Sequence, residues 1–110
     1  MTVFRAYDVR GVYGTELTDD IARKVGRALG SYLPGGRIAL GRDTRVSGPE
    51  VERAFLEGVL STGCSVERYG VLPISMIGFE TWKGGLNAAA YISASHNPPE
   101  YNGIRFRTAE

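Results

Sequence analysis

Residues 87–99 of the chain, NAAAYISASHNPP, decide how its fold is interpreted. The first seven residues of this stretch are small or β-forming and predict a buried strand. The two prolines at its end fix their own φ angles and exclude a helix, so the chain must leave the strand as a stiff turn. The side chain of Asn97 can form a local hydrogen bond in that turn. Ser95, followed directly by His96, is therefore predicted on a loop that a rigid scaffold points toward solvent.

The rest of the chain alternates predicted strands with predicted helices. Apolar residues at helical spacing lie between Thr18 and Pro34 and again between Ser47 and Val59. Thr18 is the expected N-cap of the first helix, and Ser47 has capping-box spacing to Glu50 in the second. A third helix is expected at 73–82. Strands are predicted at 3–9, 38–40, 64–69, 87–93 and 102–107, with polar turns at 8–14 and 41–45.

This alternation predicts an α/β fold, a layered βαβα domain with a mixed, mostly parallel sheet that is covered by helices and has an antiparallel edge. The 110 residues are expected to form a single domain, 1–110. A net charge of +1 gives no electrostatic reason to expect nucleic acid or an anionic membrane as a partner. The N-terminus has no signal-peptide core, and one cysteine fits a reducing cytoplasm.

The candidate site lies where three loops are expected to meet. Ligands of such sheets gather outside the carboxyl ends of the strands, and loops 8–14, 41–45 and 94–101 are placed at that rim. Several arginines around one exposed hydroxyl favour a ligand rich in oxyanions, because guanidinium groups match phosphate oxygens. Neither standard phosphate-binding loop and no serine-hydrolase elbow occurs in the chain. The side chains grouped in this way are those of Arg10, Arg42, Arg45, Ser95, His96 and Arg105.

Three segments carry a resemblance to a known family. They are YDVRG at 7–11, GRDTRVS at 41–47 and ASHNPPEYNG at 94–103. In this order they resemble the N-terminal, phosphoserine domain of the α-D-phosphohexomutases, the phosphomannomutase/phosphoglucomutase group. Members of that family are four-domain enzymes that move a phosphoryl group between the 1 and 6 positions of a hexose. The similarity extends over nearly the whole chain.

The resemblance implies a role for each matching residue. Ser95 would be the phosphoserine that donates its phosphoryl group to the sugar phosphate and takes one back, and its phosphate would give one oxygen ligand to Mg²⁺. His96 would lie beside the reacting hydroxyls, and Tyr7 and Arg10 would border the sugar phosphate. A hexose 1,6-bisphosphate would be the activator and intermediate. Arg105 stands where the family commonly has a lysine as a candidate general acid/base.

The departures from the family pattern limit what this chain can do alone. Arginine is effectively always protonated, so Arg105 can hold a phosphate but is a poor proton shuttle. Ser93 replaces the usual threonine. The family's aspartate-rich metal loop and its phosphate-gripping C-terminal domain have no counterpart in these 110 residues. Because Mg²⁺ needs about six oxygens in near-octahedral geometry, this domain alone would hold it weakly.

The sequence therefore predicts the phosphoserine domain of a phosphohexomutase that acts on a hexose phosphate together with the remaining domains of a parent enzyme. The isolated chain is expected to be inactive. The alternative is a stand-alone, non-catalytic domain that binds phosphosugars or another protein. At 42–45, a structural ion-pair network is favoured over ligand contact. For Tyr7 and Arg10, ligand contact and plain structural roles are both open.

Overall fold

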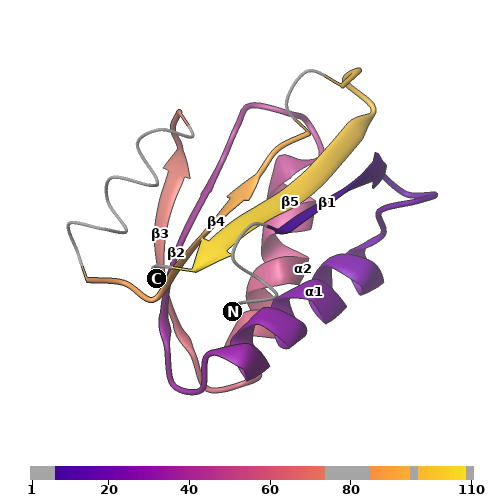
Figure 1. The fold of residues 1–110 in the computed structure, drawn as a ribbon. Helices are drawn as coiled ribbons and strands as arrows, with labels where there is room; N and C mark the ends of the chain where they lie inside the picture. The colour runs from indigo at the N-terminus through magenta and orange to yellow at the C-terminus, as the bar shows by residue number, and fades with distance from the viewer. Residues whose placement is uncertain (1–6, 74–84, 95–96, 109–110) are drawn as a thin grey trace.

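The computed structural model describes residues 7–73, 85–94 and 97–108, which form five strands and two helices (Figure 1). The helix expected at 73–82 lies outside the described residues except for its first position. The elements in chain order are β1 (Tyr7–Val12), α1 (Asp19–Tyr32), β2 (Arg37–Arg42), α2 (Gly48–Leu60), β3 (Ser65–Val71), β4 (Ala88–Ile92) and β5 (Tyr101–Thr108).

The strands form one sheet in the order β1-β5-β4-β2-β3. β2 pairs in parallel with both β3 and β4, whereas β5 pairs antiparallel with both β4 and β1. Four strands therefore run in one direction and β5 runs against them, which confirms the mixed, mostly parallel sheet. The parallel neighbours β2 and β3 are joined by α2, as a parallel pair requires a crossover connection.

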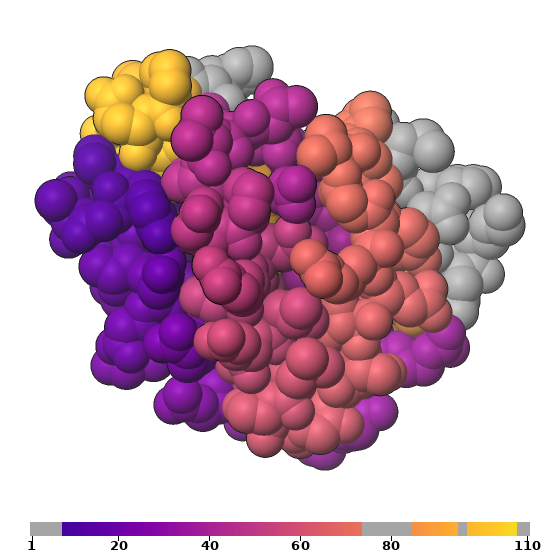
Figure 2. All heavy atoms as spheres, turned by 180° about the vertical axis from the view of Figure 1, so that it is seen from behind, coloured from indigo at the N-terminus to yellow at the C-terminus, as the bar shows by residue number. Residues whose placement is uncertain are grey.

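Both described helices lie on the same face of the sheet. In Figure 1, α2 lies behind the strands and α1 packs beside it, and in Figure 2, which is seen from behind, α2 faces the viewer. The main core is formed between these helices and the inward residues of the three middle strands. Within the described residues, neither helix is long and apolar enough to cross a membrane. The large side chains that are fully buried in this core are Phe55, Leu17, Leu29, Ile38, Leu40, Ile92, Ile104, Val51 and Val59.

The two helices approach closely because each presents a glycine to the other. A Cβ built on Gly58 of α2 would lie 2.0 Å from the carbonyl oxygen of Arg23, and one on Gly26 of α1 would lie 2.2 Å from the carbonyl oxygen of Phe55. Both distances are far below van der Waals contact, and the neighbours are backbone atoms that cannot turn away. Any larger residue at either position must therefore push the helices apart.

The helix starts differ from each other in how they are capped. Thr18 is the N-cap of α1, as predicted, and its Oγ1 accepts from the backbone N–H of Ile21 at 3.2 Å. The capping box predicted for Ser47 and Glu50 is wrong. Ser47 has a helical backbone conformation (φ −79°, ψ −2°) and its side chain makes no cap hydrogen bond. The hydroxyl instead accepts a hydrogen bond from a distant asparagine on β5.

The first two strands extend further than the sequence indicated. The first strand was predicted to end at Val9 in a polar turn, but β1 continues to Val12, paired residue for residue with β5. β2 likewise includes Gly41 and Arg42, which were assigned to the following turn. Strand pairing across the sheet overrides the local turn preference of these residues.

We expect Gly58→Ala to destabilise the chain by about 1–3 kcal/mol, because the added methyl group overlaps the α1 backbone. In an isolated helix the same change would be stabilising by about 1 kcal/mol. Urea unfolding followed by circular dichroism measures the difference. Ser31→Ala, at an exposed position of α1, is the matched control and should stabilise by at most about 0.5 kcal/mol. A Gly58→Ala variant as stable as the parent would show that the helices do not touch at this point.

Candidate functional site

The three loops that sequence analysis placed at one rim do lie together. β1, β2 and β4 point the same way, so the segments that follow them emerge at one edge of the sheet. The N–H of Asp43, just after β2, donates to the carbonyl of Ile92 at the end of β4 (3.1 Å). The N–H of Tyr13, just after β1, donates to the carbonyl of Glu100 (3.0 Å). Backbone hydrogen bonds therefore join the loops directly.

The segment that contains the predicted nucleophile is fixed on both sides. Ser95 and His96 themselves lie outside the described residues, so their roles stay predictions. The carbonyl of Ala94 accepts from both the backbone N–H of Asn97 (3.1 Å) and its side-chain Nδ2 (2.8 Å). This confirms the local hydrogen bond expected of Asn97, and it sets the distance between the residues that flank Ser95 and His96.

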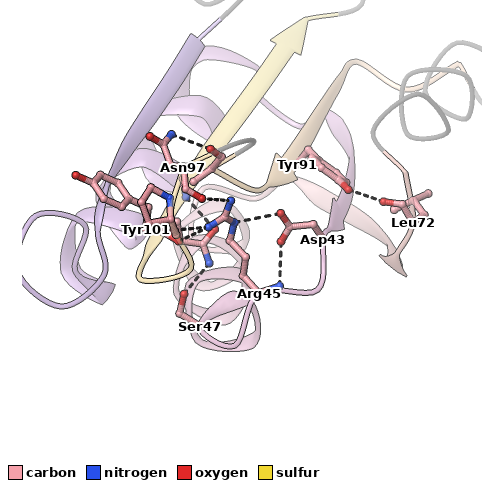
Figure 3. A network of polar contacts seen from close by, with 11 residues as sticks. Asp43, Arg45, Ser47, Leu72, Tyr91, Asn97 and Tyr101 are labelled. Carbon is pink, nitrogen blue, oxygen red and sulfur yellow. Dashed lines mark hydrogen bonds and ion pairs between the residues drawn. The ribbon is translucent and has the colours of Figure 1, made fainter.

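Arg45 attaches this loop to the end of β2 (Figure 3). Its guanidinium donates to the carbonyl oxygens of Asn97 (2.9 Å), Pro98 (2.7 Å) and Tyr101 (3.2 Å). Asp43 lies on the other side of the guanidinium, 3.4 Å from Nε, and also accepts from the backbone N–H of Arg45 (3.2 Å). The structural network that was favoured for this segment is therefore present.

Asn102 is a second attachment of the same loop, and sequence analysis missed it. Its side chain is fully buried; Nδ2 donates to the hydroxyl of Ser47 at 2.8 Å, and Oδ1 accepts from the N–H of Gly103 at 2.8 Å. A signal was present in the sequence. Asn102 precedes Ile104 and Phe106 at a spacing of two, so it occupies a core-facing position of the strand, where a polar side chain needs partners.

Gly103 is a glycine because β1 and the chain just after β4 crowd it from both sides. A Cβ at this position would lie 2.7 Å from the carbonyl oxygen of Val9 on β1 and 2.8 Å from that of Ser93. The side chain of Arg10 crosses the same point, with its Cγ 3.0 Å away. Ser93 also donates its backbone N–H to the carbonyl of Gly103 (2.9 Å). The missing side chain therefore leaves room for Arg10 to lie over Gly103 on β5, beside Ser93 just after the end of β4.

The face of the sheet opposite the helices carries a charged cluster made by Asp8, Arg10 and Arg105. Arg10 donates to both carboxylate oxygens of Asp8, with Nε at 3.0 Å from each and Nη2 at 2.5 Å from Oδ2. These hydrogen bonds raise the pKa of Arg10 above its ordinary value. Arg105 lies opposite Asp8 in the sheet register, with its Nε 4.0 Å from the same carboxylate and 43% of its side chain exposed.

Tyr7 lies on the predicted strand, whereas Arg10 is placed differently from the expected turn. Arg10 lies within β1, opposite Gly103, rather than on a loop. Tyr7 is the first residue of β1, opposite Phe106, and the prediction for its side chain stays a prediction. Arg10 lies two residues after Asp8 on β1, and Arg105 lies opposite Asp8 on β5. All three side chains are therefore on one face of the sheet.

Arg42 is not part of this group. It follows Ile38 and Leu40 at a spacing of two and therefore faces the helices, where its Nη1 lies 2.6 Å from a carboxylate oxygen of Glu52. Glu52 is 1% exposed and its other oxygen is 3.4 Å from Nε of Arg68. A buried carboxylate of this kind requires such partners. Arg42 thus joins β2 to α2 and is structural.

A hollow of about 450 Å³ opens beside the loop. Val46 at its margin is 93% exposed. The hollow therefore gives solvent and small solutes access to the region of the Arg45 contacts. Its lining residues are Asp43, Thr44, Arg45, Val46, Asn97 and Pro99.

The described residues do not form a magnesium site of their own. Among residues 7–73, 85–94 and 97–108, no three histidine, cysteine or acidic side chains come together in a way that could hold a metal ion. Two carboxylates of these segments are already paired, Asp8 with Arg10 and Asp43 with Arg45.

Solved structures of similar shape define the class of domain. A phosphoglucomutase/phosphomannomutase family protein from Burkholderia thailandensis superimposes with a TM-score of 0.79 at 35% sequence identity, over 94% of this chain and 25% of that one. A protein from Thermus thermophilus, provisionally assigned as a phosphomannomutase, gives a TM-score of 0.85 at 29% identity, over 96% and 25% of the two chains. Both likenesses cover one α/β domain of a larger protein.

The family model described as phosphoglucomutase/phosphomannomutase, alpha/beta/alpha domain I, matches residues 1–110, and the chain belongs to this family as its domain I. The resemblance stated from the sequence is thereby confirmed. The phosphoglucosamine mutase of Clostridioides difficile is 46% identical over 102 residues, which are 89% of this chain and 23% of that protein. The chain spans about a quarter of the length of the curated relatives it matches.

The contact between Ser47 and Asn102 can be tested by a double-mutant cycle. Asn102→Ala leaves the buried N–H of Gly103 without its partner and should cost about 1–3 kcal/mol, and Ser47→Ala about 1 kcal/mol. Because both changes remove the same hydrogen bond, their combination should cost less than the sum. Unfolding free energies from urea titration measure all three variants.

Thr18→Ala is the matched control for this cycle, since Thr18 is a genuine N-cap. Its loss of about 1 kcal/mol should add fully to that of Asn102→Ala. Strict additivity of Ser47→Ala with Asn102→Ala would contradict the contact.

Proposed function

We propose that this chain is the phosphoserine domain of a phosphohexomutase, which moves a phosphoryl group reversibly between the 1 and 6 positions of a hexose phosphate through Ser95. The observation that carries the proposal is the anchored loop at the carboxyl edge of the sheet. The residues on either side of Ser95 and His96 are hydrogen-bonded to each other, and the loop is hydrogen-bonded to Arg45 after β2 and to Tyr13 after β1. Family membership supports the same function.

The chemistry suits such a scaffold. Phosphoryl transfer requires little covalent work from the protein and depends on holding the reacting oxygens in line and offsetting charge. In the proposed step, a sugar hydroxyl forms a new P–O bond as the bond between phosphorus and Oγ of Ser95 breaks. The hydroxyl proton leaves to a base, and the resulting hexose 1,6-bisphosphate returns its other phosphoryl group to Ser95. His96 is proposed to lie beside the reacting hydroxyl.

The arginines of the charged cluster are proposed to interact with the phosphate groups. A phosphoserine adds about −1.5 to −2 charges, and Asp8 neutralises only part of the charge of Arg10 and Arg105. Arg10 lies over Gly103, beside the backbone that leads to Ser95. We propose that Arg10, with Tyr7, borders the sugar phosphate, and that Arg105 holds a phosphate without carrying protons.

Magnesium is proposed as the metal of the complete enzyme. The phosphate on Ser95 would supply one oxygen ligand, and the remaining ligands would come from domains outside these residues. When bound, the ion would withdraw charge from the phosphoryl oxygens. The hexose remains to be assigned by assay, and the curated relatives make glucosamine phosphate the first sugar to test. A reducing cytoplasm is the proposed location, because the single cysteine, Cys64, is a buried free thiol.

If Ser95 is the nucleophile, the enzyme should carry a phosphoryl group on this residue. When the full-length enzyme is incubated with a hexose 1,6-bisphosphate and Mg²⁺, intact mass should increase by one phosphoryl group, and peptide mapping should place it on Ser95. Ser95→Ala should abolish the label. Ser93→Ala is the matched control and should retain it, because Ser93 is buried next to Gly103. A label on Ser93 would contradict the assignment.

The 110-residue chain by itself should fold but not turn over hexose phosphates, because the metal carboxylates and the phosphate clamp of the family are absent from it. A coupled assay with glucosamine, glucose and mannose phosphates measures this. Robust turnover by the purified chain would show that the proposed dependence on further domains is wrong. A full-length protein that binds sugar phosphates without turnover would favour the non-catalytic alternative.

Substitutions of Arg105 test whether this side chain acts by its charge or by transferring a proton. In the full-length enzyme, Arg105→Ala should weaken phosphate binding and lower kcat together, since it removes a charge-assisted contact of about 1.5–3 kcal/mol. Arg105→Lys should keep or raise kcat, because lysine retains the charge and can be tuned toward a useful pKa. Arg107→Ala, on the same strand, is the matched control. An Arg105→Ala enzyme with parental kinetics would show that Arg105 does not face the phosphate.

A further inference from the structure

We infer that Arg45 is a positioning residue for phosphoryl transfer: its guanidinium sets the geometry of the loop that carries Ser95. The inference rests on the proposed function. It assigns to Arg45 an effect on the rate of the chemical step that is separate from its effect on folding. Figure 3 shows the contacts of Arg45 that support this role.

The loop needs an external donor because of its composition. Pro98 and Pro99 have no N–H, so this part of the backbone can accept hydrogen bonds but donates few. Three of its carbonyl groups, those of Asn97, Pro98 and Tyr101, point to the one guanidinium of Arg45. A single side chain, more than fifty residues away in sequence, therefore satisfies acceptors along the whole turn.

The guanidinium is itself held in place. Asp43 approaches its Nε at 3.4 Å and accepts from the backbone N–H of Arg45, and the Arg45 side chain is only 12% exposed. The N–H of Asp43 is bonded to the carbonyl of Ile92, at the end of the strand that leads into the loop. The same short segment, 43–45, thus holds the chain both before and after Ser95.

The geometry requires arginine rather than any cation. A guanidinium has five N–H donors in a planar fork, and here the two terminal nitrogens, Nη1 and Nη2, contact three carbonyls while Nε faces Asp43. A lysine ammonium is a compact group with three donors on one atom, and it cannot reach carbonyls on both sides of the turn and the carboxylate together. Charge alone should therefore not replace Arg45.

Loss of the Arg45 guanidinium should lower the rate of the chemical step. A displacement of about 1 Å between reacting groups can lower a rate by about 100-fold. Because Arg45 contacts the backbone of the loop and acts through it, the affinity for the sugar phosphate should change little. We expect Arg45→Ala to lower kcat by at least about tenfold, with KM nearly unchanged, and Arg45→Lys to recover only a small part.

Chemical rescue is the decisive measurement. The hollow beside the loop is open to solvent and is lined by Arg45 itself, so guanidinium ion can enter the space that Arg45→Ala leaves. Millimolar guanidinium chloride should raise the kcat of the full-length Arg45→Ala enzyme several-fold. Ammonium chloride at the same ionic strength should not. Arg27→Ala, at an exposed position of α1, removes one guanidinium elsewhere and should respond to neither salt.

The outcomes separate the two proposals. If the parent enzyme turns over no hexose phosphate, the proposed function fails, and this inference with it. If the parent is active and Arg45→Ala keeps its kcat, the positioning role alone is overturned. Thermal unfolding of each variant identifies a folding defect. A loss of kcat that follows only the unfolded fraction, or that guanidinium does not reverse while Arg45→Lys is fully active, also overturns it.

Discussion

The antiparallel pairing of β4 with β5 is the constraint on which the candidate site depends. β4 runs with the parallel strands and β5 returns against it, so residues 93–100 become a connection between two neighbouring strands rather than a free loop. The pairing continues past the end of β4, where the N–H of Ser93 donates to the carbonyl of Gly103 on β5. Because β5 also pairs with β1, the same strand brings Arg10 to the base of this connection.

The alternation of side chains along β5 separates the structural from the chemical face. Asn102 and Ile104 face the helices, where one makes buried hydrogen bonds and the other packs in the core. Gly103 and Arg105 face the other way, toward the charged cluster with Asp8. A shift of register by one residue would exchange the two sets and expose the core. The position of the cationic groups is therefore fixed by the same packing that stabilises the sheet.

Sequence reasoning predicted what depends on local pattern and missed what depends on contacts distant in the chain. The buried strand before Ser95, the Thr18 cap and the local bond of Asn97 follow from residue type and spacing, and all are confirmed. The hydroxyl of Ser47 could not be assigned in this way, because its partner Asn102 is 55 residues away. The continuation of the first strand beyond Val9 was missed for the same reason, since its residues are held by pairing with β5.

Asp8 and Asp43 pair with their arginines in different ways. Asp8 is shared between Arg10 and Arg105, so the cluster retains positive charge where phosphate groups are proposed to lie. Asp43, by contrast, pairs with Arg45, whose donors are turned to backbone carbonyls. Arg10 and Arg105, on the face opposite the helices, are proposed to keep charge available to a ligand. Arg45 instead uses its planar fork to hold the backbone of the loop. The difference follows from the carboxylate that each arginine meets.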